Sequence, residues 1–398
     1  MTRRPGAPML GLASAAVLAS AVVLASAAVL ASAAVVAARP VPVGRFVEIP
    51  YGVSPRHPWP TGLGDDRRSA RSRFEAPAVA PTRAWETRVG VGRVFAPAVA
   101  ADGSMYVGSQ AGVTLVAPDG SVRWALRMGL VSGTPAITPE GFAAVGGQPG
   151  EIRVVGGGRI RQRASVGGGV RGSPLVLGDG SLVVAAYDQA LHRYDAEGRR
   201  LFRTSLAGAV RGMPARSRDR LVVAAGEEVL FATLDGVVAE RAAVGAEIAL
   251  GPAVAADGAA WVLTVEGTLC AVEPDGSVRV RNELGVRPAL SSNLAIARDG
   301  SLRMATGDAG VLAVGAAGSE RWRHEADGPI IGGLTVDEAG RTLVVTVRGE
   351  LIALDEDGQK LWGVGTGSRS DAPPVLTEDA IYVATFGGTL QAWTRPSP

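Results

Sequence analysis

Short apolar runs separated by turn residues recur along most of the chain. A run such as residues 182–185 is followed by a polar turn, and a second apolar run then leads to another turn, often an Asp-Gly pair. Runs of this length are typical of β-strands joined by hairpins, because Gly and Asp tolerate the positive φ angles that tight turns require. The pattern therefore predicts an all-β protein built from many short strands.

This strand pattern repeats with a period of about 39 residues, the kind of period that marks a repeat architecture. A glycine usually follows the first position of a unit six residues later, as Gly103 follows Pro97. Four short strands in each unit make a propeller blade. We therefore predict an eight-bladed β-propeller of four-stranded blades. The first positions of the eight units are Pro97, Pro135, Pro174, Pro214, Pro252, Leu294, Leu334 and Pro374.

The two ends of the repeat region complement each other. The last unit ends near Trp393 and has no closing strand of its own, whereas residues 83–86 resemble a closing strand without a unit. Trp85 precedes Trp124, the closing residue of the first unit, by one full repeat. We therefore expect the N-terminal strand to complete the eighth blade and close the ring, which removes free sheet edges.

The segment before the repeats has a different character. Arg3 and Arg4 precede an apolar, uncharged stretch over residues 5–38, as in a signal peptide or signal anchor. Small-residue cleavage patterns occur in it, but it is also long enough to span a bilayer, so cleavage and a membrane tether both stay open. Either way we expect export, to a periplasmic, membrane-anchored or secreted state. The predicted organisation is a signal or anchor helix over 1–38, a Pro-rich linker or strap over 39–82, and the propeller over 83–398.

Composition restricts the classes of function. The formal net charge of +2 gives no reason to expect nucleic acid. Cys270 is the single cysteine, so the chain forms no internal disulfide. The histidines lie in different units, whereas metal ligands are usually clustered, and neither a phosphate loop nor a nucleophile elbow is present. We therefore predict no catalytic residue, no metal and no cofactor, and a monomer.

One pair of residues is a candidate binding site. Three residues before the first position of each unit, the chain should enter the innermost strand beside the central channel. Arg171 and Arg211 hold this place in neighbouring units, within matching Val-Arg-Gly-x-Pro stretches. Two guanidinium groups at one channel mouth suit a carboxylate, a phosphate or an acidic peptide, unless local acids already pair with them. The eight channel positions are Val94, Ser132, Arg171, Arg211, Ala249, Ser291, Ile331 and Asp371.

Two segments carry a resemblance to a known family. Residues 353–362 resemble the repeat of pyrroloquinoline-quinone-like propellers, although the Thr before the Gly is missing and the turn is one residue shorter. Residues 59–72 are similar to the strap that often precedes the first blade in that family. The resemblance covers roughly residues 57–395 and implies a propeller there. It supports the fold and does not identify an activity, because one fold can serve many functions.

The family contains quinone-dependent dehydrogenases and non-catalytic propellers such as the outer-membrane-protein assembly lipoprotein. If this chain resembled the dehydrogenases in function, the resemblance would imply a site of the kind that many of them have. In that site a quinone stacks on two adjacent cysteines, and acidic and amide side chains hold a calcium ion. The lone Cys270 cannot form that cysteine pair, and no cysteine follows the apolar stretch to carry a lipid. The chain is therefore closer to the non-catalytic branch.

Three functional hypotheses follow. The leading one is an exported, non-enzymatic propeller that acts as a scaffold and binds envelope proteins or peptides. The first alternative is a pyrroloquinoline-quinone-dependent oxidoreductase. The second is a small-anion or ligand sensor that uses Arg171 and Arg211 at the channel.

Overall fold

The computed structural model describes residues 57–396 except for 149, 171 and 309, all within the compact unit Gly44–Pro398. The predicted signal or anchor segment over 1–38 and the first part of the predicted strap therefore lie outside the described residues, as does Arg171. No helix among the described residues is long and apolar enough to cross a membrane.

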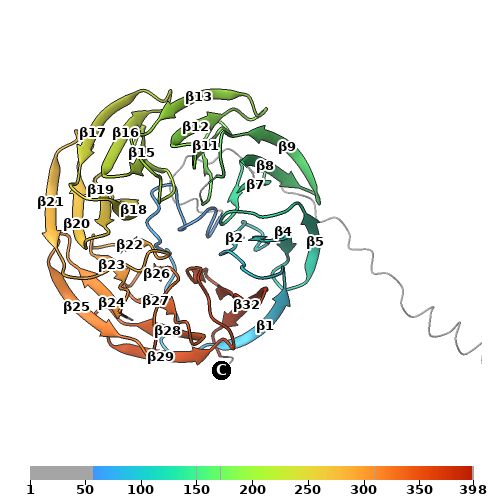
Figure 1. Cartoon of the computed structure of the whole chain (residues 1–398). Helices are drawn as coiled ribbons and strands as arrows, with labels where there is room; N and C mark the ends of the chain where they lie inside the picture. The colour runs from blue at the N-terminus through green and yellow to red at the C-terminus, as the bar shows by residue number, and fades with distance from the viewer. Residues whose placement is uncertain (1–56, 149, 171, 309, 397–398) are drawn as a thin grey trace, which may run out of the picture. The chain divides into compact units, whose positions relative to one another are not determined.

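Within the described residues, the strands form eight antiparallel four-stranded sheets arranged as blades around a central channel (Figure 1). The predicted eight-bladed propeller is confirmed. The innermost strands are β2 (Ala98–Val99), β6 (Ala136–Ile137), β10 (Leu175–Val176), β14 (Ala215–Ser217), β18 (Ile248–Val254), β22 (Leu294–Ile296), β26 (Leu334–Val336) and β30 (Val375–Leu376). The second strands are β3 (Met105–Ser109), β7 (Ala143–Gly147), β11 (Leu182–Ala186), β15 (Arg220–Ala225), β19 (Ala260–Thr264), β23 (Leu302–Ala305), β27 (Thr342–Val345) and β31 (Ile381–Ala384).

The third and fourth strands complete each blade toward the rim. The third strands are β4 (Gly112–Val116), β8 (Glu151–Gly156), β12 (Ala190–Tyr194), β16 (Glu228–Thr233), β20 (Thr268–Val272), β24 (Gly310–Val314), β28 (Glu350–Leu354) and β32 (Thr389–Thr394). The outer strands are β5 (Val122–Arg127), β9 (Arg159–Ser165), β13 (Arg200–Ser205), β17 (Val238–Ala243), β21 (Val278–Glu283), β25 (Glu320–Glu325), β29 (Lys360–Gly365) and β1 (Thr82–Arg88). Burial follows this order, since the second and third strands are almost fully buried while the outer strands alternate between exposed and half-buried residues.

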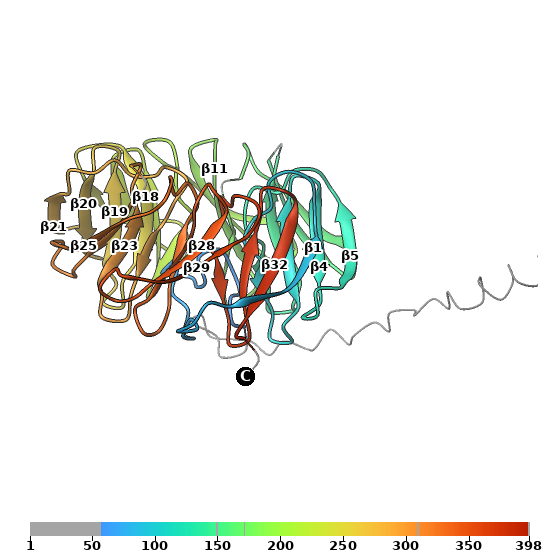
Figure 2. The same ribbon diagram turned by 90° about the horizontal axis from the view of Figure 1, so that it is seen from below.

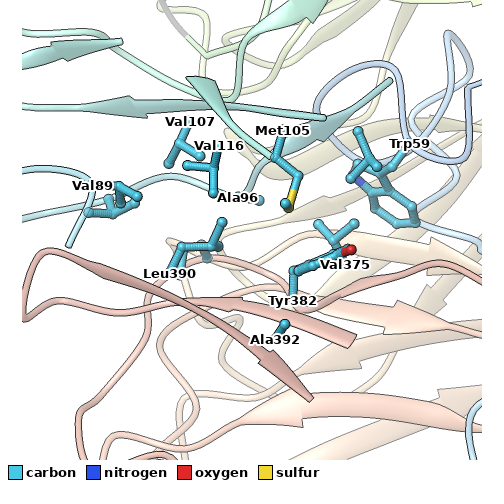
Figure 3. Packing of buried hydrophobic residues seen from close by; sticks show 14 of the residues in the cluster. Trp59, Val89, Ala96, Met105, Val107, Val116, Val375, Tyr382, Leu390 and Ala392 are labelled. Carbon is cyan, nitrogen blue, oxygen red and sulfur yellow. The ribbon is translucent and has the colours of Figure 1, made fainter. Parts of the chain in front are cut away.

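The ring closes where its two ends meet. β1 pairs with β32 in the eighth blade, with Thr87 opposite Leu390, as expected from the sequence. A core between the first and last blades seals this junction, and Figure 3 shows Met105 close to Tyr382 and Val375, with Trp59 at the end of the cluster. Segments that are far apart in the sequence thus share one hydrophobic core, and burial of this core stabilises the closed ring.

Aromatic residues of the outer strands hold neighbouring blades together. Trp85 packs against Gly120, a turn glycine of the next blade, and its Nε1 donates a hydrogen bond to Pro118 O at 3.1 Å. A Cβ on Gly120 would lie 2.6 Å from the Trp85 ring, and the φ of this residue is +84°. The glycine is therefore required both by the turn and by the neighbouring blade. Phe202 packs on Gly236, and Trp322 on Gly358, in the same way.

Residues 57–76, called the strap below, lie across one face of the ring (blue in Figure 2). The strap contacts the innermost strand of every blade, or the residues that lead into it, in chain order. The face of the ring that the strap lies across is called the strap face, and the opposite face is called the mouth face. The contacts run from blade one to blade eight as follows: Trp59 O with Val99 N, Pro60 O with Ile137 N, Thr61 Oγ1 with Ser173 Oγ, Asp66 O with Arg216 N, Arg67 O with Val254 N, Ser69 O with Ile296 N, Ala70 O with Val336 N, and Ser72 Oγ with Leu376 O.

Candidate functional site

The central channel encloses a cavity of about 460 Å³. Gly62, Leu63 and Arg68 of the strap line it together with residues of the innermost strands and of the loops on the mouth face. Because the strap crosses one end, the channel is a blind chamber that opens on the mouth face. A chamber of this size is within the range of small-ligand and peptide sites.

Arg68 forms part of the chamber floor and is fully buried. Its Nε donates to Pro214 O at 2.9 Å, and its terminal nitrogens donate to Gly62 O, Ser173 O and other oxygens at 2.9–3.3 Å. A buried guanidinium is tolerated only when its donors are satisfied. Arg68 therefore ties the strap to the third and fourth blades and has a structural role in the floor.

The structure brings several of the predicted channel positions to the chamber. Ser132, Arg211, Ala249, Ser291 and Asp371 line it. Val94 is buried instead, and the preceding residue, Arg93, faces the chamber in its place. Arg171 lies outside the described residues. The predicted pairing of Arg171 with Arg211 in one anion site therefore stays a prediction.

Both described arginines at the mouth lie close to acidic partners. Arg211 contacts Glu247, with guanidinium nitrogens 2.7 and 2.8 Å from Glu247 Oε1. Arg93 Nε lies 2.7 Å from Asp371 Oδ2, and this ion pair joins the first and last blades. An anion at Arg211 has to compete with Glu247, which weakens the electrostatic attraction that the sequence suggested.

Three exposed apolar side chains lie at the opening. Tyr187 and Leu290 are each 57% exposed and Leu130 is 37% exposed, although all three line the chamber. Leu130 and Leu290 come from the connections into the second and sixth blades, and Tyr187 from the turn between β11 and β12. The sequence analysis missed these residues because they lie in loops, where the repeat pattern does not assign a side-chain direction.

The channel lining does not match the cofactor site that the resemblance implies for quinone-dependent dehydrogenases. Asp371, the carboxylate in the lining, is already paired with Arg93. Cys270 is buried in β20 among Val262 and other apolar residues, outside the chamber lining. No group of acidic, histidine or cysteine residues suited to a metal ion occurs within the described part of the chain. We therefore derive no reaction step through a quinone or calcium.

The fold is similar to that of several solved structures. Their sequence identities to this chain are low, so the similarity concerns the fold alone. BamB from Moraxella catarrhalis is 16% identical, with a TM-score of 0.64 over 79% of this chain and 99% of that one. The computationally designed Ika8 protein is 13% identical, with a TM-score of 0.67 over 78% and 99%. Quinohemoprotein alcohol dehydrogenase from Comamonas testosteroni is 14% identical, with a TM-score of 0.68 over 86% and 82%.

Sequence comparison is more specific than the fold. No curated protein sequence matches the chain. A family model does match, over residues 109–250 and 307–395, which together are more than half of the chain. Its second matched segment contains the repeat at 353–362 that carries the resemblance. The chain therefore belongs to the family described as outer membrane protein assembly factor BamB.

Proposed function

We propose that this protein is a non-enzymatic scaffold that binds a polypeptide of the cell envelope through its mouth face. The observation that carries the proposal is the set of exposed apolar side chains, Leu130, Tyr187 and Leu290, around a blind chamber. Exposed apolar groups rimmed by polar ones are typical of protein interaction sites. The fold does not need these three side chains for its own core.

The family supports a polypeptide as the ligand. Its description refers to the assembly of outer membrane proteins, so a protein of the envelope is the partner class that the family suggests. An exposed tyrosine beside leucines suits such a partner, because an aromatic ring provides a large contact area with little side-chain entropy to lose. The paired charges at Arg93 and Arg211 then contribute orientation more than affinity.

A double substitution tests the mouth face. Tyr187→Asp with Leu290→Asp places two charges in the apolar rim, which should reduce capture of the envelope partner by about tenfold or more. Val237→Asp is the matched control, since Val237 is 64% exposed but lies near the strap face, after the turn between β16 and β17. Capture should be measured by affinity purification from envelope extracts with quantitative mass spectrometry. Equal capture by both variants would exclude the mouth face as the binding surface.

Export is the second part of the proposal. The basic residues Arg3 and Arg4 and the apolar stretch over 5–38 support it. The proposal holds for a cleaved signal and for a retained anchor. Fractionation of producing cells should place the protein in the periplasmic, membrane or secreted fraction, and recovery in the cytoplasm alone would contradict export.

A further inference from the structure

The repeat allows the eight outer strands to be compared position by position. In seven of them, a described cation lies within 3.3 Å of a carboxylate. Each such pair neutralises one cation of the rim, although an exposed pair adds little stability. The pairs are Arg83–Glu86, Arg123–Asp102, Arg203–Asp188, Arg241–Glu228, Arg279–Asp257, Arg321–Asp299 and Lys360–Glu350, at 2.6–3.3 Å.

The outer strand of the second blade, β9, departs from this pattern. It carries Arg159, Arg161 and Arg163 at alternate positions, all exposed, and it contains no acidic residue. Arg159 and Arg161 form no ion pair with any described residue. Arg163 lies 3.8 Å from Glu151, whose carboxylate is already held by Arg153 at 2.7 Å. These three arginines, called the β9 stripe below, thus leave positive charge uncompensated on the rim.

The middle arginine shows how the difference arises. At the equivalent place in other blades, Arg123, Arg279 and Arg321 pair with an aspartate in the turn between the first and second strands of their own blade. In the second blade that turn carries Glu140, and Arg161 makes no ion pair with it. Instead, Arg161 Nε donates to Gly156 O at 3.0 Å.

The guanidinium of Arg161 also lies over the Phe142 ring, 5.2 Å from its centroid. The Nε hydrogen bond and the ring contact restrict its orientation without neutralising its charge. A guanidinium held in this way loses less conformational entropy when a carboxylate binds to its free nitrogens. Arg161 is therefore prepared to bind an anion.

The arrangement of the stripe indicates the shape of the ligand. Arg159, Arg161 and Arg163 alternate along β9, but the pairing of β9 with β8 shifts between Val154 and Val155, so a bulge lies among the three arginines. On the neighbouring outer strands, Arg123 of β5 and Arg203 of β13 are paired, and each strand has one further exposed arginine that forms no ion pair with a described residue. The uncompensated charge is therefore densest along β9, and this elongated patch fits an extended chain better than a flat membrane surface.

We propose that the β9 stripe binds an extended acidic segment of a partner protein, with its carboxylates paired to the three arginines. Arginine binds carboxylates in a two-pronged geometry. This surface is on the rim and is separate from the mouth face. The inference rests on the proposed function only in taking a polypeptide as the partner.

The test uses the purified full-length chain and a fluorescein-labelled octapeptide of alternating Glu and Thr. Fluorescence anisotropy at low salt should show saturable binding that weakens as salt is added. The variant Arg159→Gln/Arg161→Gln/Arg163→Gln should bind at least about tenfold more weakly, because it lacks all three charge-assisted contacts. The matched control is Arg279→Gln/Arg281→Gln on β21, which should leave the affinity within about twofold because β21 lacks an unpaired stripe.

Several results would overturn the inference. Equal loss in the β21 control would mean that overall charge, and not the stripe, determines binding. Absence of saturable binding up to about 1 mM peptide, or binding to phosphatidylglycerol vesicles alone, would exclude the acidic segment as ligand. None of these results touches the mouth face, so the proposed function stands or fails separately.

Discussion

Among single residues, Asp66 in the strap is a buried carboxyl whose pKa is shifted by its surroundings. Its side chain is only 6% exposed and lies next to Asp65. Burial, and secondarily the charge of Asp65, raise the pKa of Asp66 to about 6, although Arg216, Arg68 and Arg67 act in the opposite direction. The backbone carbonyl of Asp66 accepts a hydrogen bond from Arg216 N, and its carboxylate lies 4.0 Å from the Arg216 guanidinium, so Asp66 is part of the contact between the strap and the fourth blade.

The raised pKa makes stability depend on pH. A carboxyl whose pKa is higher in the folded than in the unfolded state stabilises the fold fully below pH 3.8, and this contribution is lost as pH rises through about 6. Asp66→Asn cannot ionise, so its free energy of unfolding relative to wild type should rise between pH 4 and pH 7, by up to roughly 3 kcal/mol. Urea unfolding at both pH values measures this difference. The same difference at both would show that Asp66 keeps its ordinary pKa.

Turn glycines show which residues the contact between blades requires. Gly120 and Gly129 have nearly equal φ angles, +84° and +81°, but a Cβ at Gly120 would meet Trp85 at 2.6 Å, whereas a Cβ at Gly129 has nothing within 4 Å. Gly129→Ala should therefore destabilise the protein only by backbone strain, about 1–2 kcal/mol. Gly120→Ala adds a clash and should destabilise by about 1–3 kcal/mol more, measured by thermal unfolding. Equal losses of stability in the two variants would mean that the Trp85 ring moves aside for the new Cβ at little energetic cost.

At the scale of elements, β1 is the strand that closes the ring. It comes from the opposite end of the chain and pairs with β32, whereas the outer strand of each other blade follows its partner directly in the chain. Loop closure over nearly the whole propeller must therefore be achieved before this pair forms. The closing pair of strands is the place where the ring should open first.

A cross-strand disulfide tests this account of closure. Thr87→Cys with Leu390→Cys joins register partners of β1 and β32, and Thr204→Cys with Leu191→Cys joins the equivalent partners of β13 and β12. The first bond closes a loop of about 300 residues and the second one of about 14, so the first should stabilise the oxidised protein by roughly 2–3 kcal/mol more. Thermal unfolding with and without reductant measures the gain. A larger gain from the internal pair would contradict the closing role of β1.

The elements were predictable from the sequence for a physical reason. Each blade repeats the same turn chemistry, so Pro97, Gly103 and their equivalents report the blade boundaries directly. Contacts between repeats were not predictable in this way. The pairing of Arg211 with Glu247 joins two units through the shapes of two loops, and no local pattern encodes it. The exposed side chains of Tyr187 and Leu290 likewise depend on loop conformation.

At the scale of the whole molecule, the two faces of the ring differ. The strap crosses one end of the channel and forms hydrogen bonds with all eight blades. The mouth face keeps an open chamber with apolar side chains at its rim. The sequence predicted the channel and several of the residues that line it, but the difference between the faces emerges only when the strap is placed. This asymmetry is the basis for assigning partner binding to the mouth face.

Site-specific photo-crosslinking in producing cells tests this assignment most directly. A photoreactive amino acid should be introduced at Tyr187 on the mouth face and, separately, at Val237 near the strap face, since both side chains are more than half exposed. The account predicts that one recurrent envelope protein, identified by mass spectrometry, is linked from position 187 and not from position 237. No adduct from position 187, or equal yields of the same protein from both positions, would contradict a scaffold that binds through its mouth face.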